Sequence, residues 1–83
     1  MSEAEIRARV LASLLRVAPE TDVSTIRPDL PLREQIDIDS IDFLNFVIEL
    51  HHDLHVDVPE ADYDKLVTLD SAVTYLGQRV GAA

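Results

Sequence analysis

Apolar side chains recur at helical spacing near the start of the chain. Across residues 3–17 they stand three or four positions apart, the period of an amphipathic helix. Ser2, with Glu5 three residues further on, matches a capping box and predicts where this helix begins, and Pro19 predicts its end. The apolar stripe consists of Ile6, Val10, Leu11, Leu14, Leu15 and Val17.

A second helical pattern covers residues 40–54, with Asp39 or Ser40 as the predicted N-cap. When residues are placed at steps of 100°, one apolar arc is predicted to face the core, with Phe46 at its edge. That arc carries Phe43, Leu44, Val47, Leu50 and Leu54. The opposite arc, the predicted outer face, carries Ile41, Asp42, Asn45, Ile48, Glu49, His52 and Asp53. Ile41 and Ile48 share this polar and acidic arc, so they predict a strip that contacts another protein.

Residues 18–39 form a long connection, in which Pro28 and Pro31 disfavour regular structure. A connection of this length is expected to pack or to have a function. Six apolar residues predict that it packs on the core: Val23, Ile26, Leu30, Leu32, Ile36 and Ile38.

The remaining residues predict a short helix and a final long one. Residues 60–65 favour one or two helical turns, with Tyr63 and Leu66 as apolar anchors. Thr68 is the predicted N-cap of the last helix, and Gly81 follows its last periodic position. The apolar face of that helix carries Leu69, Ala72, Val73, Leu76 and Val80. With no strand pattern, the sequence predicts an all-α four-helix bundle with three main helices, a short third helix and a long structured loop after the first.

The length and composition allow one small domain, which we expect to cover residues 1–83. A chain of 83 residues that is 47% apolar is too short for two domains or for most enzyme architectures. Because it contains no cysteine, the core must form by packing alone, and thiol nucleophiles are excluded. No apolar run approaches the ~20 residues that span a bilayer, and residues 1–9 read as a helix start and not as a signal peptide. We therefore expect a cytoplasmic monomer.

The net charge of −9 is concentrated in the middle of the chain. Residues 1–33 hold five basic and five acidic side chains, whereas residues 34–64 hold ten acids and neither lysine nor arginine. Such a field repels phosphate backbones and anionic lipids, so nucleic acid and membrane surfaces are not expected as partners. It attracts basic protein surfaces, and the alternative is a merely solvated acidic face.

The segment Asp39-Ser40-Ile41-Asp42 lies where the long connection meets the second helix. A serine at a helix start often serves only as a cap. Free backbone N–H groups and the positive end of the helix dipole also suit a phosphate there. Asp39 and Asp42 would repel a free phosphate, so Ser40 is better suited to covalent modification than to ligand binding.

Five segments together resemble the acyl carrier protein family, whose pattern is Leu-Gly-x-Asp-Ser-Leu-Asp, an acidic helix ending in Glu-Glu-Glu-Phe, Ile-Pro, and a Thr-Val that opens the last helix. The matching segments are residues 36–42, 51–54, 58–60, 67–69 and 72–76. The resemblance implies that Ser40, in its motif with Asp39, receives 4′-phosphopantetheine from coenzyme A through a separate magnesium-dependent transferase. It also implies a non-catalytic protein that carries acyl groups as thioesters on the thiol of that arm.

The resemblance further implies partners in fatty-acid or specialised lipid biosynthesis. These are a phosphopantetheinyl transferase, an acyl-loading ligase, and acyltransferases or synthases whose basic patches dock on the predicted outer face. An acyl tail folded between helices would lie near Phe43, Phe46, Val47 or Leu66. Two alternatives stay open, namely an aminoacyl, peptidyl or polyketide carrier, and an unmodified acidic helical adaptor.

Several positions depart from the family pattern. Asp37 replaces a glycine, Asn45 replaces a glutamate, and His51-His52-Asp53 replaces the acidic run. The predicted outer face is therefore less acidic than that of a general fatty-acid carrier, which suggests a specialised carrier.

Three other kinds of site are disfavoured. A calcium loop from Asp37 fails because Ile41, Asp42 and Ile48 occupy ligand or glycine positions. His51 and His55 with Asp53 between them lack an evident third zinc ligand, so we expect no metal. A serine hydrolase would need a Gly-x-Ser-x-Gly motif, which the sequence lacks.

Overall fold

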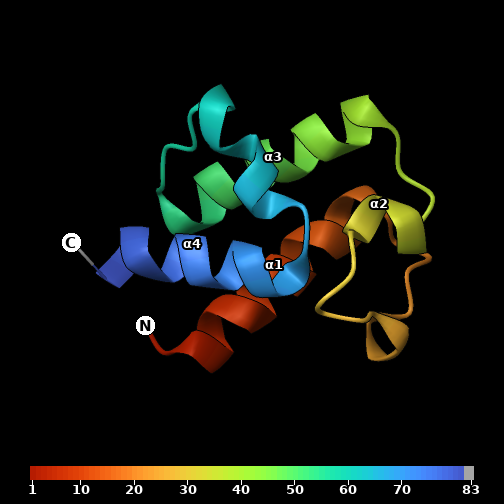
Figure 1. Cartoon of the computed structure of the whole chain (residues 1–83), viewed down its shortest axis with the longest axis horizontal. Coiled ribbons are helices and arrows are strands. Elements are labelled where there is room, and N and C mark those ends of the chain that lie inside the picture. The colour runs from red at the N-terminus through yellow and green to blue at the C-terminus, as the bar shows by residue number, and fades with distance from the viewer. Residues whose placement is uncertain (82–83) are drawn as a thin grey trace.

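A computed structural model describes residues 1–81, and its elements are all helical apart from one isolated bridge between Pro31 and Thr68. The elements are α1 (Glu3–Val17), η1 (Val23–Thr25), α2 (Leu32–Gln35), α3 (Ser40–Leu54), η2 (Glu60–Leu66) and α4 (Leu69–Gly81), as Figure 1 shows. The predicted all-α class is confirmed, and the predicted ranges 3–17 and 40–54 agree with α1 and α3.

The predicted capping box at the start of α1 is present. The Glu5 backbone N–H donates to Ser2 Oγ at 3.2 Å, and the Ser2 backbone N–H donates to Glu5 Oε1 at 3.3 Å. These hydrogen bonds with Ser2 lower the pKa of the Glu5 carboxyl. The box fixes the start of α1 because it pairs backbone N–H groups that have no partner within the helix.

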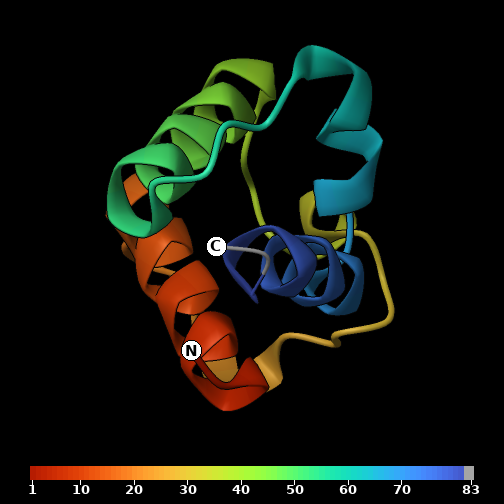
Figure 2. The ribbon, with the colours of Figure 1, turned by 90° about the vertical axis from the view of Figure 1, so that its left-hand side faces the viewer.

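The core forms where α1, α3 and α4 meet. Figure 2 shows α4 in the middle of the molecule, with α1 and α3 on one side and η2 on the other, and α4 contacts both α1 and η2. The most deeply buried side chains come from all three long helices and from the segments between them: Val10, Leu14, Leu32, Phe46, Leu50, Leu66, Val73 and Leu76.

The long connection is more regular than its prolines predicted. Pro31 is the N-cap of α2, because a proline just before a helix has no N–H that would need an intrahelical partner. The Gln35 side chain holds the turn by accepting from the Arg27 N–H at 2.7 Å and donating to the Arg27 carbonyl at 2.8 Å. Leu32 and Ile38 are buried as predicted, and Ile26 and Ile36 pack partly on the core. Val23 and Leu30 are exposed, so the expectation that they pack is wrong.

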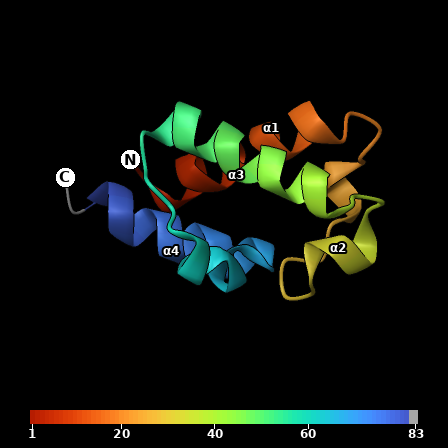
Figure 3. The same ribbon diagram turned by 90° about the horizontal axis from the view of Figure 1, so that it is seen from above.

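The short helix η2 is fastened to α4. Asp62 of η2 accepts hydrogen bonds from the Tyr75 hydroxyl at 2.7 Å and from Arg79 at 3.0 Å. Burial and the hydrogen bond to Asp62 raise the pKa of Tyr75 above its ordinary value. Thr68 caps α4 as predicted, since its Oγ1 accepts from the Ser71 N–H at 3.0 Å, and Gly81 is the last residue of that helix instead of following it. The hydrogen bonds of Asp62 therefore hold η2 against α4, and Figure 3 shows these two helices side by side from above.

One buried side chain in α1 predicts a stabilising substitution. Ser13 is completely buried, and its hydroxyl has no hydrogen-bond partner within residues 1–81. Ser13→Ala removes this unpaired polar group and improves helix propensity, so we expect the free energy of unfolding to rise by about 1 kcal/mol. Thermal unfolding should then shift upward by about 4–8 °C.

The matched control is Ser24→Ala, because Ser24 is exposed and its hydroxyl donates to Asp22 at 2.6 Å. That variant should show no gain. A loss of stability in Ser13→Ala would mean that the Ser13 hydroxyl is satisfied in solution.

Candidate functional site

The first turn of α3 is held by a capping box built from two aspartates. Asp39 is the N-cap, and its Oδ1 accepts from the Asp42 N–H at 2.8 Å. In return, Asp42 Oδ2 accepts from the Asp39 N–H at 3.2 Å. Buried Ile38 anchors the chain just before this turn. The two carboxylates are therefore engaged in holding the backbone at the helix start.

Ser40 lies inside this turn without having to cap it. It is the first residue of α3 and is exposed, and no hydrogen bond of its hydroxyl is present among the described residues. Of the two predicted N-cap candidates, Asp39 takes that role and Ser40 does not. The hydroxyl is thus accessible at the positive end of a helix dipole, where unpaired first-turn N–H groups favour an attached phosphate.

Asp37 fits its loop without backbone strain. The only residue other than glycine with a positive φ in the described part of the chain is His55, at 55°. Asp37 is exposed and therefore needs neither the conformational freedom of glycine nor space in the core. Its replacement of the family glycine adds a carboxylate beside the turn and leaves the backbone path ordinary.

The exposed side of α3 differs from the predicted one. Phe46 is completely buried, whereas Leu44 is 44% exposed, so the prediction of Leu44 in the core and Phe46 at its edge is wrong. The reason is that α1 packs against the Phe46 side of α3, which turns the buried face toward α1. Leu44 consequently joins Ile41 and Ile48, which are 68% and 44% exposed. We call Ile41, Leu44 and Ile48 the exposed stripe.

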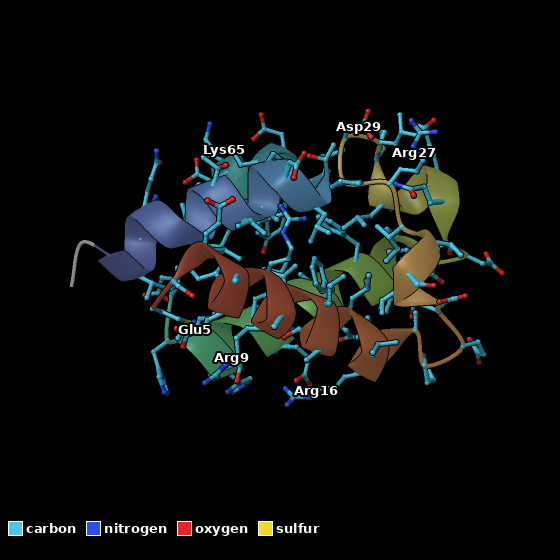
Figure 4. All side chains as sticks on the ribbon, turned by 90° about the horizontal axis from the view of Figure 1, so that it is seen from below. Glu5, Arg9, Arg16, Arg27, Asp29 and Lys65 are labelled. Atoms are coloured by element: carbon cyan, nitrogen blue, oxygen red, sulfur yellow. The ribbon has the colours of Figure 1, made fainter. Side chains whose placement is uncertain are left out.

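Two acids of the predicted outer face are paired with α1. Arg16 bonds to Glu49 at 3.0 Å and Arg9 to Asp53 at 2.9 Å, and Figure 4 shows both arginines on the same side of α1. The Asp53 side chain is only 18% exposed, so its placement on the outer face is wrong, and Glu49 lies at the edge of that face with 35% of its side chain exposed. Asn45 and His52 are exposed beside the exposed stripe, as predicted.

The histidines at the end of α3 have local structural roles. His51 Nδ1 lies 3.1 Å from the Val56 carbonyl and 3.3 Å from Asp57 Oδ1, and His55 ends the helix in the left-handed conformation. Within residues 1–81, no group of three or more histidine, aspartate or glutamate side chains is arranged to hold a metal ion. No helix of the described part is both long and apolar enough to cross a membrane.

Comparisons with known proteins agree with this arrangement. Residues 8–76 match the family described as "Phosphopantetheine attachment site". The chain is 33% identical over 76 residues to an acyl carrier protein of Lactobacillus johnsonii, which covers 92% of this chain and 94% of that protein. It is 28% identical over 81 residues to an acyl carrier protein of Lactobacillus acidophilus, with 98% and 100% covered. A third relative, the acyl carrier protein of Chlorobium luteolum, is 28% identical over 76 residues, with 92% and 96% covered.

The fold, the site and these matches define a phosphopantetheine-binding carrier. The chain belongs to the acyl carrier protein family, whose members are non-catalytic carriers with covalently attached 4′-phosphopantetheine. Members of this family interact with phosphopantetheinyl transferases and with enzymes that handle acyl groups.

Proposed function

We propose that Ser40 is the attachment residue and that the chain carries acyl groups in fatty-acid or specialised lipid biosynthesis. The observation that supports this best is the exposed Ser40 hydroxyl, left without a capping role because Asp39 and Asp42 form the box around it.

The attachment requires a nucleophile that a partner enzyme can reach. Ser40 Oγ attacks the phosphorus of coenzyme A that bears the pantetheine, forming a new O–P bond. The bond from that phosphorus to the adenosine 3′,5′-bisphosphate portion breaks, and the serine proton passes to a base of the transferase. When attached, the group supplies a terminal thiol for thioester formation, which the chain itself lacks because it has no cysteine. The capping box keeps the α3 start in place, and the first-turn N–H groups favour the phosphodiester.

Intact mass measurement tests the proposal. We expect the protein to gain the mass of one phosphopantetheine group after incubation with coenzyme A, magnesium and a broad-specificity transferase, and peptide mapping should locate it at Ser40. Absence of a gain, with a reference carrier modified in the same reaction, would favour the unmodified adaptor. Mass measurement of protein isolated from its own host then distinguishes an acyl cargo from an aminoacyl, peptidyl or polyketide one.

We further propose that partner enzymes dock on the exposed stripe, beside Ser40. These are the transferase, an acyl-loading ligase, and an acyltransferase or synthase. Glu49 and Asp53 are paired with arginines and Asp42 belongs to the capping box, so the apolar side chains contribute most of the contact. The acidic block speeds the approach of basic partners, whereas buried apolar area stabilises the complex.

Two substitutions in the exposed stripe should therefore weaken recognition by the transferase. Combining Ile41→Ala with Ile48→Ala removes exposed aliphatic groups without opening the core, so we expect KM for the carrier to rise about tenfold. Glu49→Gln should change KM by less than about twofold, because an exposed ion pair with Arg16 contributes little. An unchanged KM in the double variant, or a larger effect from Glu49→Gln, would contradict this assignment. Steady-state kinetics measures both, with circular dichroism as the control for folding.

A further inference from the structure

Two small clefts lie along α3 on the side that faces η2. The first has a volume of about 260 Å³ and is lined by Arg33, Phe43, Tyr63, Asp64 and Val67. The second has a volume of about 190 Å³ and is lined by Val47, Ile48, His51, Asp57, Val58 and Tyr63. Tyr63 is the one residue common to both, so its side chain stands between them.

The first cleft begins close to Ser40. Phe43 follows Ser40 by three residues on α3, and side chains at this spacing are neighbours on a helix surface. Val47, in the second cleft, is one further turn along the same side of the helix. A group carried on Ser40 therefore reaches the first cleft before the second.

The Phe43 and Tyr63 rings close the passage between α3 and η2. Their centroids are 6.2 Å apart, and the rings meet edge to face at 71°, a favourable aromatic arrangement. Beneath them Phe46 and Leu66 are completely buried, so the first cleft has no continuation into the core. Of the four residues expected near an acyl tail, Phe43 and Val47 line the clefts, whereas Phe46 and Leu66 are covered.

Tyr63 is held in this position by its neighbour in η2. Asp62 accepts hydrogen bonds from Tyr75 and Arg79 of α4, which fasten η2 to the bundle. Opening the passage by swinging η2 outward would break both hydrogen bonds. The barrier between the clefts is therefore part of the folded structure.

We propose that Tyr63, packed against Phe43, is a specificity-determining residue that restricts the sheltered cargo to short or single-ring acyl groups. An apolar cavity of about 150 Å³ is enough for one benzene molecule, so the first cleft suits a short chain or one ring and is too small for a long chain. This inference rests on the proposed attachment at Ser40.

Thermal unfolding of loaded protein tests the restriction. Ser40 is loaded with pantetheine analogues that carry butyryl, benzoyl or palmitoyl groups as stable amides, and each form is compared with its unacylated counterpart. Butyryl and benzoyl should raise the unfolding midpoint by about 4–8 °C, since they are buried only in the folded state. Palmitoyl should give no larger shift than butyryl, and its exposed chain should delay elution from a hydrophobic interaction column.

Tyr63→Ala should reverse the ranking. Removing the ring joins the two clefts, so palmitoyl should then raise the midpoint more than butyryl and elute earlier than on the unsubstituted protein. Glu60→Ala is the matched control, because Glu60 is exposed in the same short helix as Tyr63 and lines neither cleft. If Tyr63→Ala fails to fold, Tyr63→Leu keeps an apolar anchor in η2 while removing the ring and should shift the ranking in the same direction.

A larger shift from palmitoyl than from butyryl in the unsubstituted protein would overturn this inference, as would a ranking unaffected by a folded Tyr63 variant. Either result would leave the proposed carrier function intact, because loading itself would have succeeded. Failure to load any analogue at Ser40 would instead overturn the proposed function.

Discussion

Ser40→Ala is expected to abolish phosphopantetheine attachment completely while leaving the free energy of unfolding within about 0.5 kcal/mol of the original. Attachment is lost because the substitution removes the only nucleophilic atom of this residue. Stability is retained because Asp39, and not Ser40, caps α3, and Ser40 is exposed. Intact mass and urea unfolding measure the two effects on one protein sample.

Ser24→Ala provides the control for this experiment. Ser24 is also an exposed serine that follows an aspartate, Asp22, two residues earlier, but it lies in η1 away from α3. It should be modified as fully as the unsubstituted protein. Modification that persists in Ser40→Ala would move the attachment site to another serine.

Asp39→Ala is informative beside these variants, because it separates the hydroxyl from the structure that presents it. Loss of an N-cap costs about 1 kcal/mol, so Asp39→Ala should lower the free energy of unfolding by about that amount although Ser40 is still present. Ser40→Ala should instead keep its stability and lose the attachment. The site thus consists of Ser40, the proposed attachment residue, and the pair Asp39 and Asp42, which positions it.

The helix starts could be predicted from the sequence because capping is a local interaction. Ser2 with Glu5 and Thr68 with Ser71 join atoms three residues apart, so short sequence patterns contain what is needed to recognise them. The same holds for the position of Ser40 at a helix start. The choice between Asp39 and Ser40 as cap could not be made from the pattern, since both residue types cap well.

Interactions between distant segments were not predictable in this way. The pair Arg9 and Asp53 is separated by 44 residues, and Arg16 and Glu49 by 33. The acids of the predicted outer face therefore overstate the charge that α3 presents to partners, because Glu49 and Asp53 are paired with arginines of α1. Only the packing of α1 against α3 showed which carboxylates are neutralised.

The buried face of α3 is rotated relative to the helical-wheel prediction. The packing of α1 against α3 is one cause, and the exposed stripe is a second. A helical wheel assigns the core by the spacing of apolar residues, and it treats apolar residues that dock partners as if they belonged inside. Leu44 was assigned to the core for this reason, because it shares its arc with Val47. Because the exposed stripe is also apolar, a helical wheel averages it with the buried face. The centre of the predicted apolar arc is therefore displaced away from the side that packs against α1.

Phe46→Ala should consequently destabilise the fold by about 3–5 kcal/mol, whereas Leu44→Ala should cost less than about 1 kcal/mol. Phe46 is completely buried between the long helices, so its removal loses apolar burial and leaves a cavity that the packed neighbours fill only in part. Leu44 is 44% exposed, and its truncation removes little buried area.

Urea unfolding of the two variants distinguishes the structure from the helical-wheel assignment, since that assignment expects the larger loss from Leu44→Ala. A small domain has a total stability of about 5–15 kcal/mol, so the loss from Phe46→Ala would be a large part of the whole. Comparable losses from both variants would mean that α3 is rotated in solution relative to α1, and the exposed stripe would then have to be assigned anew. The Phe46 and Leu44 pair therefore tests the fold and the docking surface together, because a single rotation of α3 determines both.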